Sequence, residues 1–291
     1  MRHRTLLPVL ILGVLAAAGA PNFAAAQSWS TRSLSRRSLG EDLLEVNVKF
    51  ASGALRLRAG SPTSLYRAEL RYDADHFEPT AAYDAGSGTL RLGVEGDSDR
   101  DGWEMSQESG QYLDVELSPL VPLNLHVEFG MAVGMIDLGG LSLSRAEIAS
   151  GASETVVAFS EPNRIRCERL EVAVGAAELI VRELGNARCE SIEIAGGAGK
   201  MTVDLTGEWD AGLDTQIELT VGVATLTLRV PENLGVAVEL TRLFAGFESS
   251  GFTKRGDRYF SSNYDTAETK VALAITAALG DVDVVWLEPD R

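Results

Sequence analysis

The sequence predicts an all-β protein: a β-solenoid of about five coils, with a period of about 23 residues, capped by β-hairpins at both ends. The first observation is a repeat in which an alternating apolar strand, a glycine and a second alternating strand follow one another. The second is the spacing of those glycines, at 21, 24, 22 and 25 residues, which leaves no room for a helix in each coil. The repeat is marked by Gly130, Gly151, Gly175, Gly197 and Gly222.

Alternation within each strand separates a core side from a solvent side. Before Gly175, Leu170 and Val172 would face the core while Glu171 faces solvent. We expect each repeated glycine to form a corner that needs either a positive φ or the close approach of another backbone. The alternative is an antiparallel sandwich with regularly spaced strands. The solenoid is preferred because the pattern keeps its register across whole coils.

The amino terminus has the features of a secretory signal peptide. Arg2 and Arg4 form a positive segment, residues 6–18 are apolar, and three alanines precede Gln27. The apolar stretch is too short to cross a bilayer, and no later segment approaches the length of a spanning helix. We therefore expect cleavage before Gln27 and a periplasmic or secreted mature chain without a transmembrane segment. Such a compartment permits disulfides.

Five parts follow from these patterns: a signal peptide, a flexible tether, an N-terminal β-hairpin cap, the solenoid coils, and C-terminal strands with a cap. The tether is predicted because that stretch is rich in serine and arginine and poor in apolar residues. The caps are predicted because an uncovered sheet edge invites aggregation. The expected bounds are residues 1–26, 27–40, 41–120, 121–233 and 234–291.

The composition argues against several classes of function. The chain has 26 Lys and Arg against 42 Asp and Glu, a net charge of −16, which disfavours nucleic acid as a partner. Three histidines and two cysteines are too few for a His-rich metal centre or a zinc ribbon. Neither G-x-S-x-G nor H-E-x-x-H occurs. We therefore expect a protein that is not an enzyme.

One row of charged residues recurs four positions before each corner glycine. In-register coils would stack this row at about 4.8 Å per step. Because adjacent carboxylates repel, we expect that replacing Glu171 and Glu193 by Gln stabilises the protein at low salt. The row is either an interaction face for cations or a basic partner, or an ordinary solvated surface. Its members are His126, Glu147, Glu171, Glu193 and Glu218.

An acidic segment at residues 97–108 matches the spacing of a calcium loop. Asp97, Asp99, Asp101 and Glu108 stand where such a loop has its carboxylate ligands, with Gly102 at its sharp turn. The flanking segments are strands rather than helices, so the context is not that of an EF-hand. The alternative is a polar hairpin loop. Calcium is the single cofactor that the sequence raises.

The two cysteines lie one coil apart. Cys167 and Cys189 are separated by 22 residues, and each stands between an arginine and a glutamate. Stacked coils would bring their Cα atoms within the range of a disulfide. A structural disulfide and two stacked, unbonded thiols are both compatible with the sequence.

The order of these features resembles a known family. The resemblance is carried by PLNLHVEFGMAVGMIDLGGL at 122–141, by the glycine-spaced strands, and by the late segment at 256–286. It covers about residues 41–288. These segments are similar to the toast-rack family of bacterial envelope β-solenoid domains, which is akin to putative-adhesin domains and to the C-terminal region of LiaF-like cell-wall-stress proteins. The resemblance implies an exported solenoid without catalytic residues.

Together these features predict a non-catalytic exported module of the bacterial cell envelope, acting in scaffolding, adhesion or sensing through a side face. Its expected partner is an envelope protein or polysaccharide. The first alternative is a calcium-stabilised interaction module. The second, less favoured, is an enzyme that acts on envelope polysaccharide.

Overall fold

The computed structural model describes residues 28–96, 110–247 and 250–288, and these residues are almost entirely β-structure. The all-β prediction is confirmed. None of the helical structure in the described residues is long and apolar enough to cross a membrane. One 3₁₀ turn, η1 (Leu184–Ala187), interrupts the strands in these ranges.

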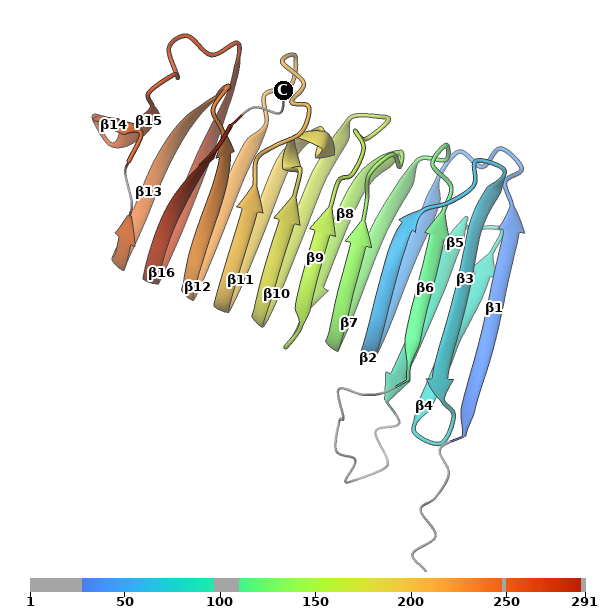
Figure 1. Cartoon of the computed structure of the whole chain (residues 1–291). Helices are drawn as coiled ribbons and strands as arrows, with labels where there is room; N and C mark the ends of the chain where they lie inside the picture. Colours follow the sequence, from blue (N-terminus) through green and yellow to red (C-terminus); the bar gives the residue numbers. More distant parts are fainter. Residues whose placement is uncertain (1–27, 97–109, 248–249, 289–291) are drawn as a thin grey trace, which may run out of the picture.

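The centre of the molecule is a stack of parallel strands that pair residue for residue (Figure 1). Each long strand turns at a corner and continues in a second layer. We call the part before the corner the first arm and the part after it the second arm. In order along the stack the strands are β2 (Leu44–Ala59), β7 (Leu123–Asp137), β8 (Leu143–Ser150) with β9 (Glu154–Ala158), β10 (Cys167–Arg182), β11 (Cys189–Asp204) and β12 (Gln216–Pro231).

Close backbone approach is the reason for most of the corner glycines. None of the five has a positive φ. A Cβ added to Gly222 would lie 2.4 Å from the carbonyl oxygen of Gly197, and one added to Gly197 would lie 2.7 Å from that of Gly175. Of the two reasons that the sequence offered for these glycines, the contact between stacked corners is therefore the one that applies.

The core lies between the two arms and runs the length of the stack. Leu170, Val172, Ile192 and Ile194 are buried, as their alternation predicts, while Glu171 remains partly exposed. The parallel pairing places Leu170 beside Ile192 and Val172 beside Ile194. Each rung therefore buries its apolar residues against the equivalent residues of the next rung.

The order of strands departs from the order of the sequence at both ends. The C-terminal strand β16 (Thr269–Leu287) lies between β12 and β13 (Leu234–Phe247), and it is parallel to both. At the other end, β5 (Thr89–Gly96) pairs in parallel with the first arm of β2, and β6 (Tyr112–Leu117) with its second arm.

The expected hairpin caps are thus only part of each flank. Antiparallel hairpins do occur, formed by β4 (Phe77–Asp84) with β5, and by β14 (Phe252–Arg255) with β15 (Arg258–Ser261). However, β2, β16 and β13 extend the parallel stack itself. The physical reason is that β2 and β16 carry the same apolar alternation as the central coils, and that the first half of β13 is buried, so all three pack against the same core.

The prediction of a flexible tether over residues 27–40 is wrong for the described part of that range. The edge strand β1 (Trp29–Arg37) pairs antiparallel with β3 (Ser64–Asp73) along its whole length. Ser33, Ser35 and Arg37 face solvent, whereas Leu34 packs against the core and the Arg36 guanidinium lies over the ring of Tyr83. Polar and charged residues are typical of an edge strand that must resist pairing with other chains, so the composition indicates a protected edge rather than disorder.

Candidate binding face

The structure places the charged row of the first arms in direct register. His126 pairs with Glu147, Glu147 with Glu171, Glu171 with Glu193, and Glu193 with Glu218. All five side chains lie on the outward side of the first arms. We call this row the glutamate ladder. The geometry brings the residues together, although it does not by itself assign them a partner.

An arginine and a histidine contact the carboxylates of the glutamate ladder. The Arg169 guanidinium contacts Glu171 and donates a second hydrogen bond to Glu193 through Nη2, at 2.9 Å from Oε1. At the other end, Nδ1 of His126 lies 3.1 Å from a carboxylate oxygen of Glu147. Arg169 stands six positions before the corner glycine Gly175, in the outward row next to the ladder. Counting six positions before each corner glycine, as was done with four for the ladder, identifies it in the sequence.

Removal of Arg169 should leave the repulsion between the ladder carboxylates uncompensated. Because its guanidinium is shared between two of them, we expect Arg169→Gln to destabilise the protein by about 1 kcal/mol at low salt. The loss should shrink in 1 M salt, which screens exposed charges. Urea unfolding at both salt concentrations measures it. In the Arg169→Gln background, adding Glu171→Gln and Glu193→Gln should recover stability. No loss at low salt would mean that Arg169 does not hold the ladder.

Cys167 and Cys189 form a disulfide in the structure. The two residues are register partners at the start of β10 and β11, and both are fully buried. The bond therefore joins two neighbouring rungs of the stack. It is remote from solvent and serves the fold rather than a reaction.

The residues of the predicted calcium loop, Asp97, Asp99, Asp101 and Glu108, lie outside the described residues, so calcium binding there stays a prediction. Within residues 28–96, 110–247 and 250–288, no three His, Cys, Asp or Glu side chains are grouped so that they could hold a metal ion.

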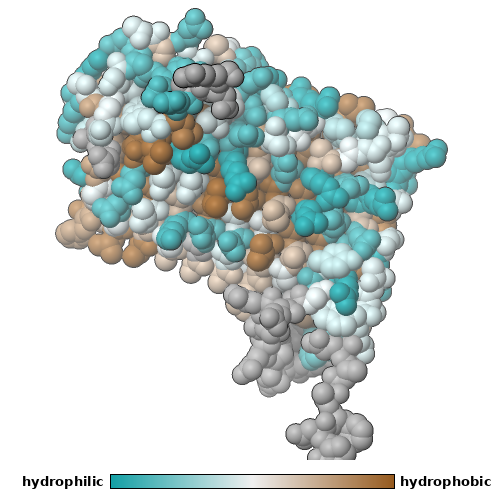
Figure 2. All heavy atoms as spheres, in the orientation of Figure 1, coloured by the Kyte–Doolittle hydropathy of each residue, from teal (hydrophilic) through white to brown (hydrophobic). Residues whose placement is uncertain are grey.

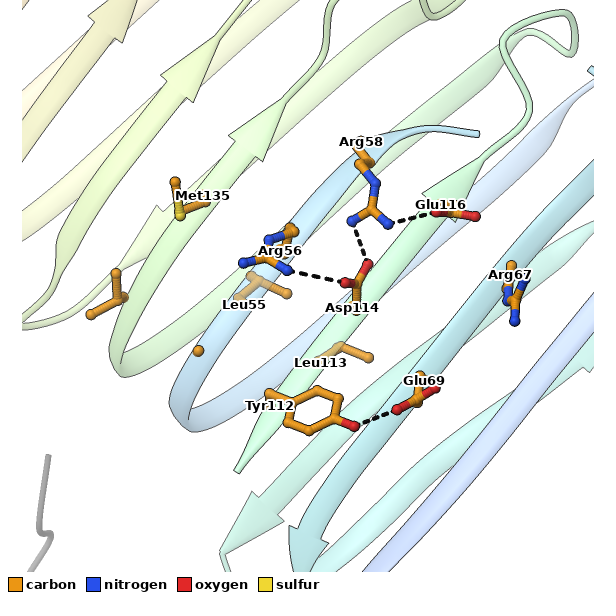
Figure 3. Close-up of a pocket in the computed structure, with 12 residues that line it drawn as sticks. Leu55, Arg56, Arg58, Arg67, Glu69, Tyr112, Leu113, Asp114, Glu116 and Met135 are labelled. Carbon is orange, nitrogen blue, oxygen red and sulfur yellow. Dashed lines mark hydrogen bonds and ion pairs between the residues drawn. The ribbon is translucent and has the colours of Figure 1, made fainter. Parts of the chain in front are cut away.

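A groove of about 570 Å³ lies on the outer face of the second arms, and the sequence did not predict it (Figure 3). It crosses β3, β6, β2 and β7. In the space-filling view, which looks onto the second arms, this face mixes hydrophilic and hydrophobic residues (Figure 2). We call this groove on β3, β6, β2 and β7 the cross-strand groove. It is lined by Ala54, Leu55, Arg56, Arg58, Arg67, Glu69, Tyr112, Leu113, Asp114, Glu116, Val133 and Met135.

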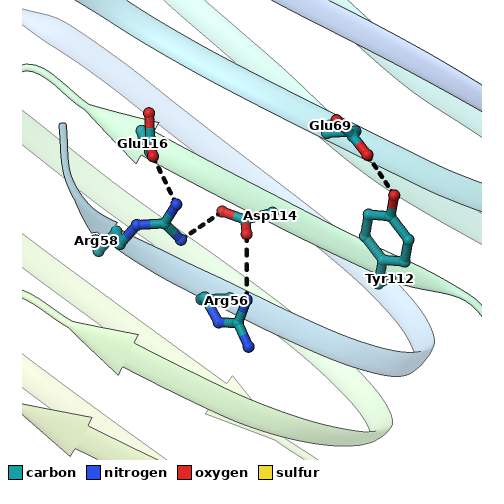
Figure 4. A network of polar contacts seen from close by, with 6 residues as sticks. All are labelled: Arg56, Arg58, Glu69, Tyr112, Asp114 and Glu116. Atoms are coloured by element: carbon teal, nitrogen blue, oxygen red, sulfur yellow. Dashed lines mark hydrogen bonds and ion pairs between the residues drawn. The ribbon is translucent and has the colours of Figure 1, made fainter. Parts of the chain in front are cut away.

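A connected set of ion pairs forms the floor of the cross-strand groove (Figure 4). Arg58 donates to Oδ1 of Asp114 at 2.7 Å and to Oε1 of Glu116 at 2.6 Å. Arg56 donates to the other oxygen of Asp114 at 3.4 Å. Burial alone would lower the pKa of Arg58, but the Asp114 and Glu116 carboxylates outweigh it and raise that pKa. The guanidinium therefore stays charged.

The remaining polar pair of the groove keeps a phenol protonated. The hydroxyl of Tyr112 donates to the Glu69 carboxylate. This hydrogen bond is the main cause of the raised pKa of Tyr112. Tyr112 therefore stays a neutral phenol near neutral pH. Beside these polar groups, Val133 and Met135 are 48% and 51% exposed and form an apolar end.

Strand alternation and the pairing of β6 with β2 build this face. In β2 the outward residues Arg56 and Arg58 alternate with buried Leu55 and Leu57, and Asp114 alternates similarly in β6. The register of the two strands places Arg56 beside Asp114 and Arg58 beside Glu116. In the sequence this site is marked by two short segments whose outward residues carry opposite charges. The groove cannot be predicted from them without knowing that β6 pairs with the second arm of β2.

Two family models match the chain. Residues 25–168 match a domain described as the N-terminal domain of toast_rack, DUF2154. Residues 183–284 match the C-terminal domain of LiaF, a protein of the cell wall-active antibiotics response. None of the curated proteins matches the chain at a significant level.

A solved structure shares the fold. A putative cell adhesion protein from Clostridium sporogenes aligns with 89% of this chain and all of its own, at 15% identity and a TM-score of 0.51. A putative adhesin from Bacteroides fragilis aligns with 89% of this chain and 98% of its own, at 7% identity and a TM-score of 0.35. With the two family matches, which cover both halves, the chain belongs to the toast-rack family, as an N-terminal toast-rack domain followed by a LiaF-like C-terminal domain.

Proposed function

We propose that this protein is a non-enzymatic binding module of the bacterial cell envelope and that it contacts its target through the cross-strand groove. The observation that carries the proposal is the charge-compensated floor formed by Arg56, Arg58, Asp114 and Glu116, beside an apolar end. Such a surface offers donors, acceptors and apolar contact together, on a rigid sheet. The envelope setting comes from the family.

Binding without chemistry is supported by the state of the ionisable groups. In the groove, Arg58 remains a cation and Tyr112 remains a neutral phenol, because each is held by carboxylates. A general acid or base works best when its pKa lies near the working pH. These paired groups are suited to orienting a ligand instead. We expect no soluble sugar to be released when the protein is incubated with cell-wall polysaccharide.

Co-sedimentation with purified, insoluble bacterial cell-wall sacculi tests the proposal. We expect the wild-type protein to pellet with the sacculi and the double variant Arg56→Ser, Met135→Ser to bind at least about tenfold more weakly. Both side chains are well exposed, so the fold should survive. The matched control is Arg145→Ser, Met131→Ser, with the same changes at exposed positions outside the groove.

Three results would redirect the proposal. Equal binding by the groove variant and the wild type would remove the groove as the contact. Loss of binding in Glu171→Gln, Glu193→Gln would favour the glutamate ladder as the interaction face. Loss of binding when calcium is chelated would favour the calcium-stabilised module that Asp97, Asp99, Asp101 and Glu108 suggest.

A further inference from the structure

The cross-strand groove continues beyond the residues already described. A second hollow of about 430 Å³ adjoins it and shares Arg67, Glu69 and Glu116 with it. Together the two hollows cross five neighbouring strands, from β1 to β7, a width of about 19 Å at the usual strand spacing. We call them the polar track. Four serines line the added part, Ser33, Ser35, Ser61 and Ser64, and the hydroxyl of Ser64 is hydrogen-bonded to backbone carbonyl groups.

The polar track lies on the face of a sheet. Its strands β3, β6, β2 and β7 are paired on both sides, so their backbone groups are engaged in the ladders, and the edge strand β1 stands at the end of the track. An extended peptide gains much of its affinity by adding a strand to an open edge, and the face of the track offers no such edge between β3 and β7. Recognition must come from side chains: serine hydroxyls, carboxylates, guanidinium groups and one phenol.

These side chains match the chemistry of a sugar. A pyranose presents hydroxyl groups that both donate and accept hydrogen bonds, and it has a C–H face that packs on apolar or aromatic groups. The track offers acceptors at Glu69 and Glu116, donors at Arg56, and apolar contact at Met135. Its length, several times that of one side chain, suits a short oligosaccharide lying across the strands.

Arg67 is the cation of the track whose charge is not already used. Its side chain is exposed and lines both hollows. Figure 3 shows it projecting from β3. Across residues 28–96, 110–247 and 250–288, no ion pair or hydrogen bond is formed by its guanidinium. Its register partner Glu116 is taken by Arg58. An exposed guanidinium next to a hydroxyl-lined groove is suited to a carboxylate or a phosphate.

The overall charge limits how acidic the ligand can be. The chain carries a net charge of −16, so a dense polyanion would be repelled at long range. One acidic group at a single arginine avoids that repulsion. From these observations we infer that the polar track binds a short oligosaccharide carrying one acidic group, and that this group is held by Arg67. The inference rests on the proposed function and specifies its ligand.

Calorimetry with matched probes tests the inference. The acidic probe is the disaccharide N-acetylglucosaminyl-N-acetylmuramic acid, and the neutral probe is chitobiose, which lacks the lactyl carboxylate. Chitobiose 6-phosphate is a second acidic probe, in which a phosphate takes the place of the carboxylate. We expect the wild-type protein to bind an acidic probe about tenfold more tightly than chitobiose, as one charge-assisted hydrogen-bonded contact would give. Arg67→Gln should abolish that preference.

The control variant is Arg91→Gln, the same change at an exposed arginine on a first-arm strand, and it should keep the preference. A preference retained by Arg67→Gln, or equal wild-type affinity for all three probes, would overturn the inference. The protein could bind none of the probes and still pellet with sacculi through the groove. That result would overturn the sugar assignment but not the proposed function. Tight binding of an acidic peptide in place of sugars would also overturn it.

Discussion

Gly222→Ala is expected to destabilise the protein by about 3 kcal/mol, the upper end of the range for overpacked sites. The new Cβ would lie 2.4 Å from the carbonyl oxygen of Gly197. That oxygen belongs to the backbone of the neighbouring corner, so it cannot move away as the tip of a flexible side chain could. Urea unfolding followed by circular dichroism measures the loss.

The same substitution elsewhere in the glycine row provides the control. A Cβ added to Gly151 would lie 3.4 Å from the carbonyl oxygen of Gly130, which is close to ordinary contact. We therefore expect Gly151→Ala to cost less than about 1 kcal/mol, since neither glycine has a positive φ. Equal losses at the two positions would show that crowding between stacked corners is not what requires the glycines.

Removing the disulfide is expected to cost about 3 kcal/mol, because Cys167 and Cys189 close a loop of about 23 residues and thereby restrict the unfolded chain. The double variant Cys167→Ala, Cys189→Ala removes it, and urea unfolding without reductant compares it with the oxidised wild type. Both positions are buried, so part of the loss will come from the smaller side chains.

Reductant separates those two contributions. Adding it to the wild type removes the bond without changing side-chain volume, and it should lower stability by most of the same amount. Adding it to the double alanine variant should change nothing. Full reduction of the wild type would be verified by a thiol assay. If it left the stability unchanged, that result would contradict a stabilising role for the bond.

The central rungs could be predicted from the sequence because every coil repeats one local rule. Leu170 and Ile192 alternate with outward glutamates at the same distance from their corner glycines, so register and facing follow together. The ends could not be predicted in this way. The insertion of β16 between β12 and β13 depends on which strand can cover the last rung, and no local pattern encodes that order.

The two candidate surfaces also differ in whether the sequence alone could predict them. The glutamate ladder was accessible because its members recur at a fixed position in the repeat. The cross-strand groove was not, because Arg58 and Asp114 are 56 residues apart and meet through pairing of β2 with β6. Composition alone was also misleading at β1, where serine and arginine mark a protected edge strand. In each case the missing information was the identity of the neighbouring strand.

Amide chemical shifts of the isotope-labelled protein, recorded with and without N-acetylglucosaminyl-N-acetylmuramic acid, test the central claim most directly. The account predicts that the shifted amides belong to the strands under the groove: the second arms of β2 and β7, together with β3 and β6. Amides beside Glu171 and Glu193 in β10 and β11 should stay in place. Shifts confined to those ladder strands, with none under the groove, would contradict the assignment of the binding face.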